Sequence, residues 1–148
     1  MQTYANFSVG GSISVNCHGR YIGHGPIISS VLELKLVSAS GEIIVANRER
    51  NQDIFYATIG GYGGIGVIAE ATLQLVDNEK VERQTALLDV EEYPSFFNKE
   101  IRNDTNVIFQ NGDLYPPDFE TIRNVSWKRS SKNRRGRESR RCAIFYVR

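Results

Sequence analysis

The alternation of apolar and polar residues in the first half of the chain predicts an antiparallel β-hairpin. Residues 31–37 put Leu32, Leu34 and Leu36 on one face of a strand and place charged residues on the other. Residues 38–41 end in Gly41, which tolerates the positive φ of a tight turn. Residues 42–46 then return as the second strand of the hairpin.

A short helix, a glycine run and a third strand follow the hairpin. Asn51 is a suitable N-cap for a helix over residues 51–58, and Gly60 or Gly61 ends that helix. In the glycine run, we expect Tyr62 to pack against the protein rather than to stack on a ligand. Residues 67–75 alternate again, and their predicted apolar face consists of Ala69, Ala71, Leu73 and Leu75.

The second half of the chain predicts a further helix and strand after a domain boundary. The chain becomes polar between Asp77 and Gln84, which suits a boundary. Residues 91–97 are expected to form a helix with Pro94 in its first turn, and residues 107–115 a strand with a turn signal at Asn111–Gly112. Strands with a few short helices in this order indicate an α+β fold with an antiparallel sheet.

Composition narrows the class of protein. The 148 residues are 41% hydrophobic and 24% charged, which is typical of a globular domain. No apolar run approaches the roughly 18 residues of a membrane span, and no secretory leader follows Met1. Cys17 and Cys142 are too far apart in sequence to indicate a disulfide scaffold or a zinc site. We therefore expect a cytoplasmic protein without a metal centre.

The charges are distributed unevenly along the chain. Residues 129–148 hold eight Lys or Arg against one Glu, a net charge of +7, whereas residues 1–128 hold ten against 16, a net charge of −6. Basic blocks of this kind are usually solvated and disordered, and some bind polyanions. A nucleic-acid partner is not expected, because the basic run occurs without a recognisable nucleic-acid-binding module.

Two glycine-containing segments are the strongest functional signal, and we expect them to lie together. The first is Ser8–Gly11 followed by Val15–Gly19, and the second is the run from Gly60 to Ile68. Crowded glycines let main-chain N–H groups approach a phosphate closely. The second run contains G-x-G-x-x-G, but a dinucleotide fold needs a strand before that motif and a helix after it. The predicted order here is the reverse, so we reject that interpretation.

These segments, taken together with the hairpin, resemble FAD-linked oxidases of the vanillyl-alcohol oxidase or PCMH-type superfamily. The resemblance is closest to the branch of sugar-lactone, alditol and decaprenylphosphoryl-ribose oxidases. It is strong over residues 5–76 and weaker over residues 77–128, where it depends on residues 111–117 and 125–127. It implies that residues 1–76 are the second half of a PCMH-type FAD-binding domain. Residues 77–128 would then open a substrate domain, and residues 129–148 would be a disordered tail outside the family pattern.

The resemblance also implies roles for individual residues. The residues expected along the FAD pyrophosphate are Ser8, Val9, Gly10 and Gly11. Those expected beside the isoalloxazine ring are Val15, Asn16, Cys17 and His18, and those at the adenine end are Gly66, Val67 and Ile68. Arg20 is expected near the substrate, and no catalytic residue is assigned. Judged from the residues alone, a core histidine bonded to the backbone is the favoured interpretation of His18.

The implied function is that of a flavoprotein oxidoreductase fragment. In the complete enzyme, FAD would accept a hydride at N5 from an alcohol or sugar-type substrate. The resemblance implies that an amino-terminal subdomain and part of the substrate domain are missing here, so we expect no turnover from this chain by itself. The alternative is a non-catalytic remnant whose basic tail contacts polyanions.

Overall fold

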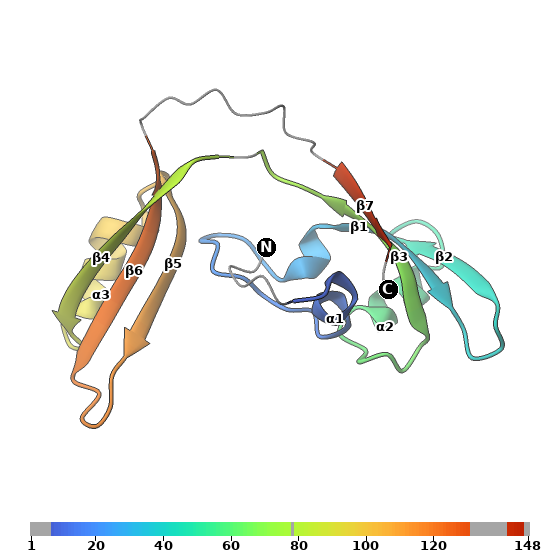
Figure 1. The fold of residues 1–148 in the computed structure, drawn as a ribbon, viewed down its shortest axis with the longest axis horizontal. Coiled ribbons are helices and arrows are strands. Elements are labelled where there is room, and N and C mark those ends of the chain that lie inside the picture. Colours follow the sequence, from blue (N-terminus) through green and yellow to red (C-terminus); the bar gives the residue numbers. More distant parts are fainter. Residues whose placement is uncertain (1–6, 78, 131–141, 147–148) are drawn as a thin grey trace. The chain divides into compact units, whose positions relative to one another are not determined.

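A computed structural model describes residues 7–77, 79–130 and 142–146 of the chain. These residues form two compact units, which are described separately (Figure 1). The first unit contains residues 7–19, 24–77 and 142–146, and the second contains residues 20–23 and 79–130. The chain therefore leaves the first unit twice, once for the four-residue segment 20–23 and again after Asp77.

The first unit is an antiparallel sheet with short helices packed against it. Its strand order is β2-β1-β3-β7, with bounds β1 Val31–Val37, β2 Ile43–Asn47, β3 Val67–Gln74 and β7 Cys142–Tyr146. The helical elements are α1 Val9–Ser14, the 3₁₀ turn η1 Ile27–Ser29 and α2 Gln52–Thr58. The predicted hairpin is confirmed as β1 paired with β2, and Gly41 in its turn has a φ of +82°. The predicted α+β class is confirmed as well.

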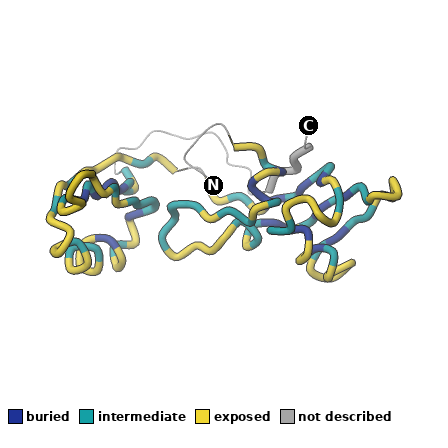
Figure 2. Tube along the Cα trace, turned by 90° about the horizontal axis from the view of Figure 1, so that it is seen from below, coloured by how far each residue is buried: buried dark blue, intermediate teal, exposed yellow. Residues whose placement is uncertain are grey.

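The core of the first unit contains residues from its helices and from β1, β2 and β3. Figure 2 colours each described residue by its burial. Ile13 of α1 and Phe55 of α2 are fully buried, as is Leu34 of β1. Helix α2 follows the prediction closely, although Asn51 at its N-cap has a left-handed φ of 50° and makes no side-chain cap bond. Its side chain donates instead to the carbonyl of Val45, which ties the start of the helix to β2.

Two β-bulges change which residues of β1 and β3 face the core. Register shifts occur between Val31 and Glu33 and between Lys35 and Leu36. A bulge inserts one unpaired residue and reverses the side-chain alternation beyond it. The buried positions are therefore Val31, Leu34 and Leu36 in β1 and Ile68, Ala71 and Leu73 in β3. The expectations that Leu32 and Ala69 share these buried faces are wrong: Leu32 is 39% exposed and Ala69 is only half-buried.

The second unit is a three-stranded antiparallel sheet with one helical segment. Its strand order is β4-β6-β5, with bounds β4 Val81–Asp89, β5 Val107–Leu114 and β6 Thr121–Arg129. Helix α3 (Tyr93–Phe96) has Pro94 in its first turn, as predicted, and continues as a π-helical turn, η2 (Phe97–Arg102). Ile101 of η2 is 2% exposed and anchors this segment.

The expected turn at Asn111–Gly112 is wrong, because both residues lie within β5. Gly112 instead allows two side chains to pack closely against the strand. A Cβ at this position would lie 2.8 Å from Cδ1 of Ile122 and 3.1 Å from the hydroxyl of Tyr93. A glycine in a strand often marks such a close approach. The Asn-Gly pair that signals a turn in the sequence therefore serves packing within a strand here.

The basic tail is only partly described. Of residues 129–148, which were expected to be disordered, residues 131–141 and 147–148 lie outside the described residues. Within it, however, Cys142–Tyr146 form β7, which pairs antiparallel to β3 from Glu70 to Gln74. The expectation of disorder therefore does not describe these five residues.

Candidate functional site

The Ser8–Gly11 segment begins helix α1 rather than forming an isolated turn. Ser8 is the N-cap, and its Oγ accepts a hydrogen bond of 3.1 Å from the main-chain N–H of Gly11. Gly10 is buried and helical, so it does not need a positive φ. A Cβ on Gly11 would lie 2.7 Å from Ser8 Oγ. Glycine at position 11 therefore leaves room for the cap.

The Val15–His18 segment is held by main-chain contacts on both sides. Cys17 donates to the carbonyl of Ser12 at 3.0 Å and accepts from Ile27 at 2.8 Å. Asn16 has a φ of 45°, and its Oδ1 accepts from the N–H of Ile28 at 3.3 Å. His18 is exposed, so the alternative of a core histidine is wrong.

The two glycine-containing segments lie side by side, as predicted. The N–H of Gly60 donates to the carbonyl of Ile13, and the N–H of Tyr62 donates to the carbonyl of Ser14, both at 3.0 Å. The glycine run follows helix α2 and precedes strand β3. This order confirms that the run is not a dinucleotide-binding fingerprint, since that motif precedes a helix.

Several of the glycines serve the fold of the first unit. A Cβ on Gly61 would lie 2.1 Å from the carbonyl oxygen of Ala57, and one on Gly66 would lie 2.6 Å from that of Val37. Gly63 differs, because its φ is +81° and no atom lies within 4 Å of where its Cβ would be. Gly63 is therefore the position in this run that opens onto unfilled space.

Apolar side chains are exposed where the two segments meet. Tyr62 is 80% exposed, so the expectation that it packs against the protein is wrong. Val15 is 46% exposed and directly follows Ser14, whose carbonyl accepts the hydrogen bond from Tyr62. Farther along the run, Ile65 and Val67 are 42% and 69% exposed. Exposed apolar side chains and main-chain hydrogen-bonding groups therefore lie together at this junction.

Arg20 belongs to the second unit, whereas the eleven residues predicted to bind cofactor belong to the first. The Arg20–Ile22 stretch extends the edge of β5: the N–H of Gln110 donates to the carbonyl of Arg20 at 3.0 Å. The Arg20 guanidinium donates to Oδ1 of Asn111 at 3.1 Å, and Asn111 donates to Asp113 at 2.7 Å. Arg20 is thus fixed on the sheet by backbone and side chain together.

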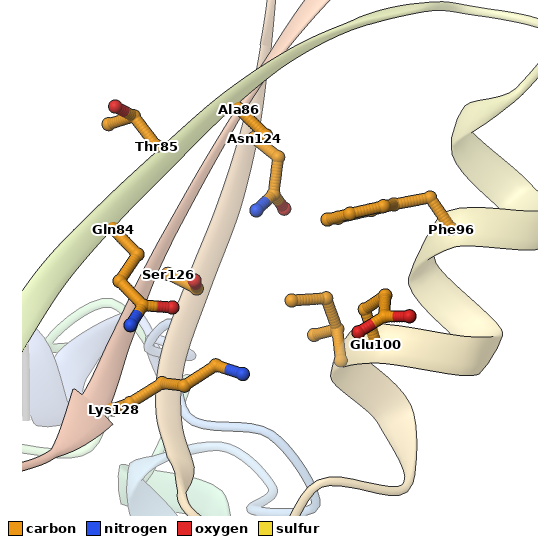
Figure 3. A pocket seen from close by; sticks show the side chains of 9 residues that line it. Gln84, Thr85, Ala86, Phe96, Glu100, Asn124, Ser126 and Lys128 are labelled. Atoms are coloured by element: carbon orange, nitrogen blue, oxygen red, sulfur yellow. The ribbon is translucent and has the colours of Figure 1, made fainter.

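The second unit also contains a pocket of about 300 Å³ between its sheet and helical segment (Figure 3). Asn124 and Ser126 of β6, each 2% exposed, point toward it, and Phe96 faces them. Gln110 donates both to Oδ1 of Asn124 and to the hydroxyl of Tyr93. Burial raises the pKa of Tyr93, and the Gln110 bond partly offsets that rise. None of the predicted site residues lines this pocket, and the alternation Asn124, Ser126 on β6 is the sequence signal that could have indicated it.

Comparison with known proteins shows that part of the chain is similar to two groups of dehydrogenases. Cytokinin dehydrogenase 9 of Oryza sativa subsp. japonica is 38% identical over 86 residues, which is 57% of this chain and 16% of that protein. L-galactono-1,4-lactone dehydrogenase 1, mitochondrial, of the same organism is 36% identical over 95 residues, 62% of this chain and 16% of that protein. Cytokinin dehydrogenase 1 of Arabidopsis thaliana is 34% identical over 73 residues, 49% of this chain and 13% of that protein.

Both groups of relatives are FAD-binding oxidoreductases of the PCMH type, so the resemblance noted in the sequence is confirmed. The chain spans about one sixth of the length of these relatives. No protein-family model matches it. Among the described residues, no helix is both long and apolar enough to cross a membrane.

Proposed function

We propose that this chain supplies part of the FAD-binding site of a flavin-dependent oxidoreductase. The observation that carries the proposal is the pair of main-chain hydrogen bonds that join Gly60 and Tyr62 to the end of α1. They bring together the two segments in which the sequence placed cofactor contacts. The relatives support the cofactor more strongly than the substrate, because their names specify two different substrates, cytokinins and a sugar lactone.

The proposed roles follow the order of the chain. Main-chain groups of Ser8–Gly11 would contact the pyrophosphate. The Val15–His18 stretch, in which Val15 and His18 are exposed, would face the isoalloxazine ring. Gly66, Val67 and Ile68 would meet the adenine end through main-chain groups. For Gly66 this role comes in addition to its close contact with Val37, which is sufficient by itself to require glycine.

The second unit is proposed to open the substrate domain. Arg20 would orient an alcohol or sugar-type substrate, and Asn111 would hold the Arg20 guanidinium in place. When bound, FAD supplies the redox chemistry by accepting a hydride from the carbon that bears the hydroxyl group. The contribution of this chain would be to bind and orient, since no residue here is assigned as a catalytic base.

The experiment compares two glycines of the first unit whose φ values are nearly the same. Gly63 and Gly41 have φ values of +81° and +82°, and neither has an atom within 4 Å of an added Cβ. An alanine is therefore strained by a positive φ at both positions, but only Gly63 lies in the candidate site. FAD is titrated into the 148-residue chain and binding is followed by flavin fluorescence and calorimetry.

We expect reversible, non-covalent FAD binding that Gly63→Ala weakens and Gly41→Ala leaves within error. Equal weakening by both variants would mean that the effect is general destabilisation rather than loss of a contact. A wild-type chain that binds no FAD would reject the proposal in favour of the alternative, a non-catalytic remnant. Substrate-dependent bleaching of bound flavin by sugar lactones and alditols then tests the proposed substrate class in a longer protein that contains this segment.

A further inference from the structure

Tyr62 combines an exposed ring with an unfavourable backbone conformation. Among the described residues, no large apolar side chain is more exposed than Tyr62, at 80%. Its φ of 52° lies in the left-handed region, which is uncommon for a bulky residue that is not glycine. Residues held in such conformations cluster at ligand-binding sites. Core packing does not explain the choice of tyrosine here, because the ring lies outside the core.

Hydrogen bonds of the surrounding loop hold Tyr62 in a defined place. Its N–H donates to the carbonyl of Ser14 at 3.0 Å, and the N–H of Gly64 donates to the carbonyl of Gly61 at 2.9 Å. The loop thus presents the tyrosine beside the end of α1, next to the exposed Val15. On the other side, Gly63 opens onto space without neighbouring atoms within 4 Å of its added Cβ.

We propose that the ring of Tyr62 stacks on a planar ring of the cofactor. The inference rests on the proposed function, since it assumes that FAD occupies the junction of the two segments. Both the adenine and the isoalloxazine of FAD offer a flat aromatic face, and tyrosine stacks on such faces with little loss of side-chain freedom. A solvent-facing aromatic ring on a loop that main-chain hydrogen bonds hold in place has the form of one side of a stacking site.

The test uses the 148-residue chain and three substitutions. Tyr62→Gly removes the ring and relieves the positive φ, so it leaves the loop at least as stable. Tyr62→Phe keeps the ring and removes the hydroxyl. Tyr56→Ala is the matched control, because Tyr56 is also exposed, at 45%, but lies on α2. FAD, FMN and ADP are titrated into each protein, and circular dichroism confirms that each variant is folded.

We expect Tyr62→Gly to weaken FAD binding roughly five- to 150-fold, which is the loss expected when one ring stacked on a base is removed. Tyr62→Phe and Tyr56→Ala should remain within about twofold of the wild type, a change below the range attributed to stacking. A parallel loss for FMN identifies the isoalloxazine as the stacked ring, and a parallel loss for ADP identifies the adenine.

Unchanged FAD affinity in Tyr62→Gly would overturn the inference while leaving the proposed function intact. An equal loss in Tyr62→Phe would also overturn it, because the hydroxyl and not the ring would then be responsible. A wild-type chain that binds no FAD would reject the proposed function and this inference together.

Discussion

Replacing Gly66 by alanine should destabilise the first unit independently of any cofactor. The new Cβ would lie 2.6 Å from the carbonyl oxygen of Val37 and 3.3 Å from its carbonyl carbon. Both atoms belong to the backbone of β1 at the point where Val37 pairs with Val67. A side chain could rotate away from such a contact, but here the strand ends must separate.

The expected cost follows from two opposing effects. Overpacking that displaces backbone costs about 1–3 kcal/mol. Alanine also restricts the unfolded chain, which stabilises the protein by about 0.4–1 kcal/mol where φ is not positive. The midpoints of these two ranges leave a net loss of about 1.3 kcal/mol, which corresponds to a fall in Tm of roughly 5–10 °C for a domain of about 60–100 residues.

The measurement must report on the first unit. Thermal unfolding followed by far-UV circular dichroism, together with amide hydrogen exchange across β1 and β3, serves this purpose. Fluorescence of Trp127, the single tryptophan, reports on the second unit and serves as an internal reference. Gly25→Ala is the control, because its Cβ would meet only the side-chain Oγ of Ser29 at 3.1 Å.

This reasoning would be refuted if the Gly66→Ala and Gly25→Ala variants had the same Tm for unfolding of the first unit. The result also bears on how cofactor-binding data are interpreted. If Gly66→Ala unfolds the end of β3, a loss of FAD binding in that variant does not demonstrate a contact between Gly66 and adenine. Gly63 and Tyr62 are more informative positions, because neither is packed against the backbone of a neighbouring strand.

Two further predictions concern stability. Leu34→Ala should lower the free energy of unfolding by about 2–5 kcal/mol, because Leu34 is fully buried. Leu32→Ala, at the exposed bulge, should lower it by less than about 1 kcal/mol. Urea unfolding followed by circular dichroism measures both changes. In the second unit, the hydrogen bond from Lys128 lowers the pKa of Asp104 below its ordinary 3.8. Asp104→Asn should therefore reduce stability at neutral pH, and the difference from wild type should vanish as the pH falls through the lowered pKa, as monitored by Trp127 fluorescence. A difference that persists in acid would show that the ion pair is not its source.

Much of the local structure could be predicted because it depends on short-range patterns. The alternation in residues 31–46 and the N-cap and glycine signals around residues 51–61 identified the hairpin and α2 nearly to their ends. The same reasoning rejected a dinucleotide fold, since it needed only the order of helix, glycines and strand. The association of the two glycine-containing segments followed from their shared composition and from the family resemblance.

The features that could not be predicted depend on contacts between distant residues. Leu32 and Val31 are both apolar, and only the pairing of β1 with β3 decides which of them the bulge exposes. Asn111–Gly112 carries a turn signal, but the approach of Ile122 and Tyr93 explains the glycine within a strand. In each case two local conformations suit the residues, and the neighbouring strand selects between them.

The amino-acid sequence by itself determined the antiparallel α+β class, the positions of the main strands and helices, and the likeness to FAD-linked oxidoreductases. The tertiary structure alone decided that Arg20 joins the second unit through β5 and that the ring of Tyr62 faces solvent. The physical reason is that periodicity and glycine content act within a few residues of the chain. Exposure and partnership arise only when hydrogen bonds such as Tyr62 to Ser14 bring separate segments together.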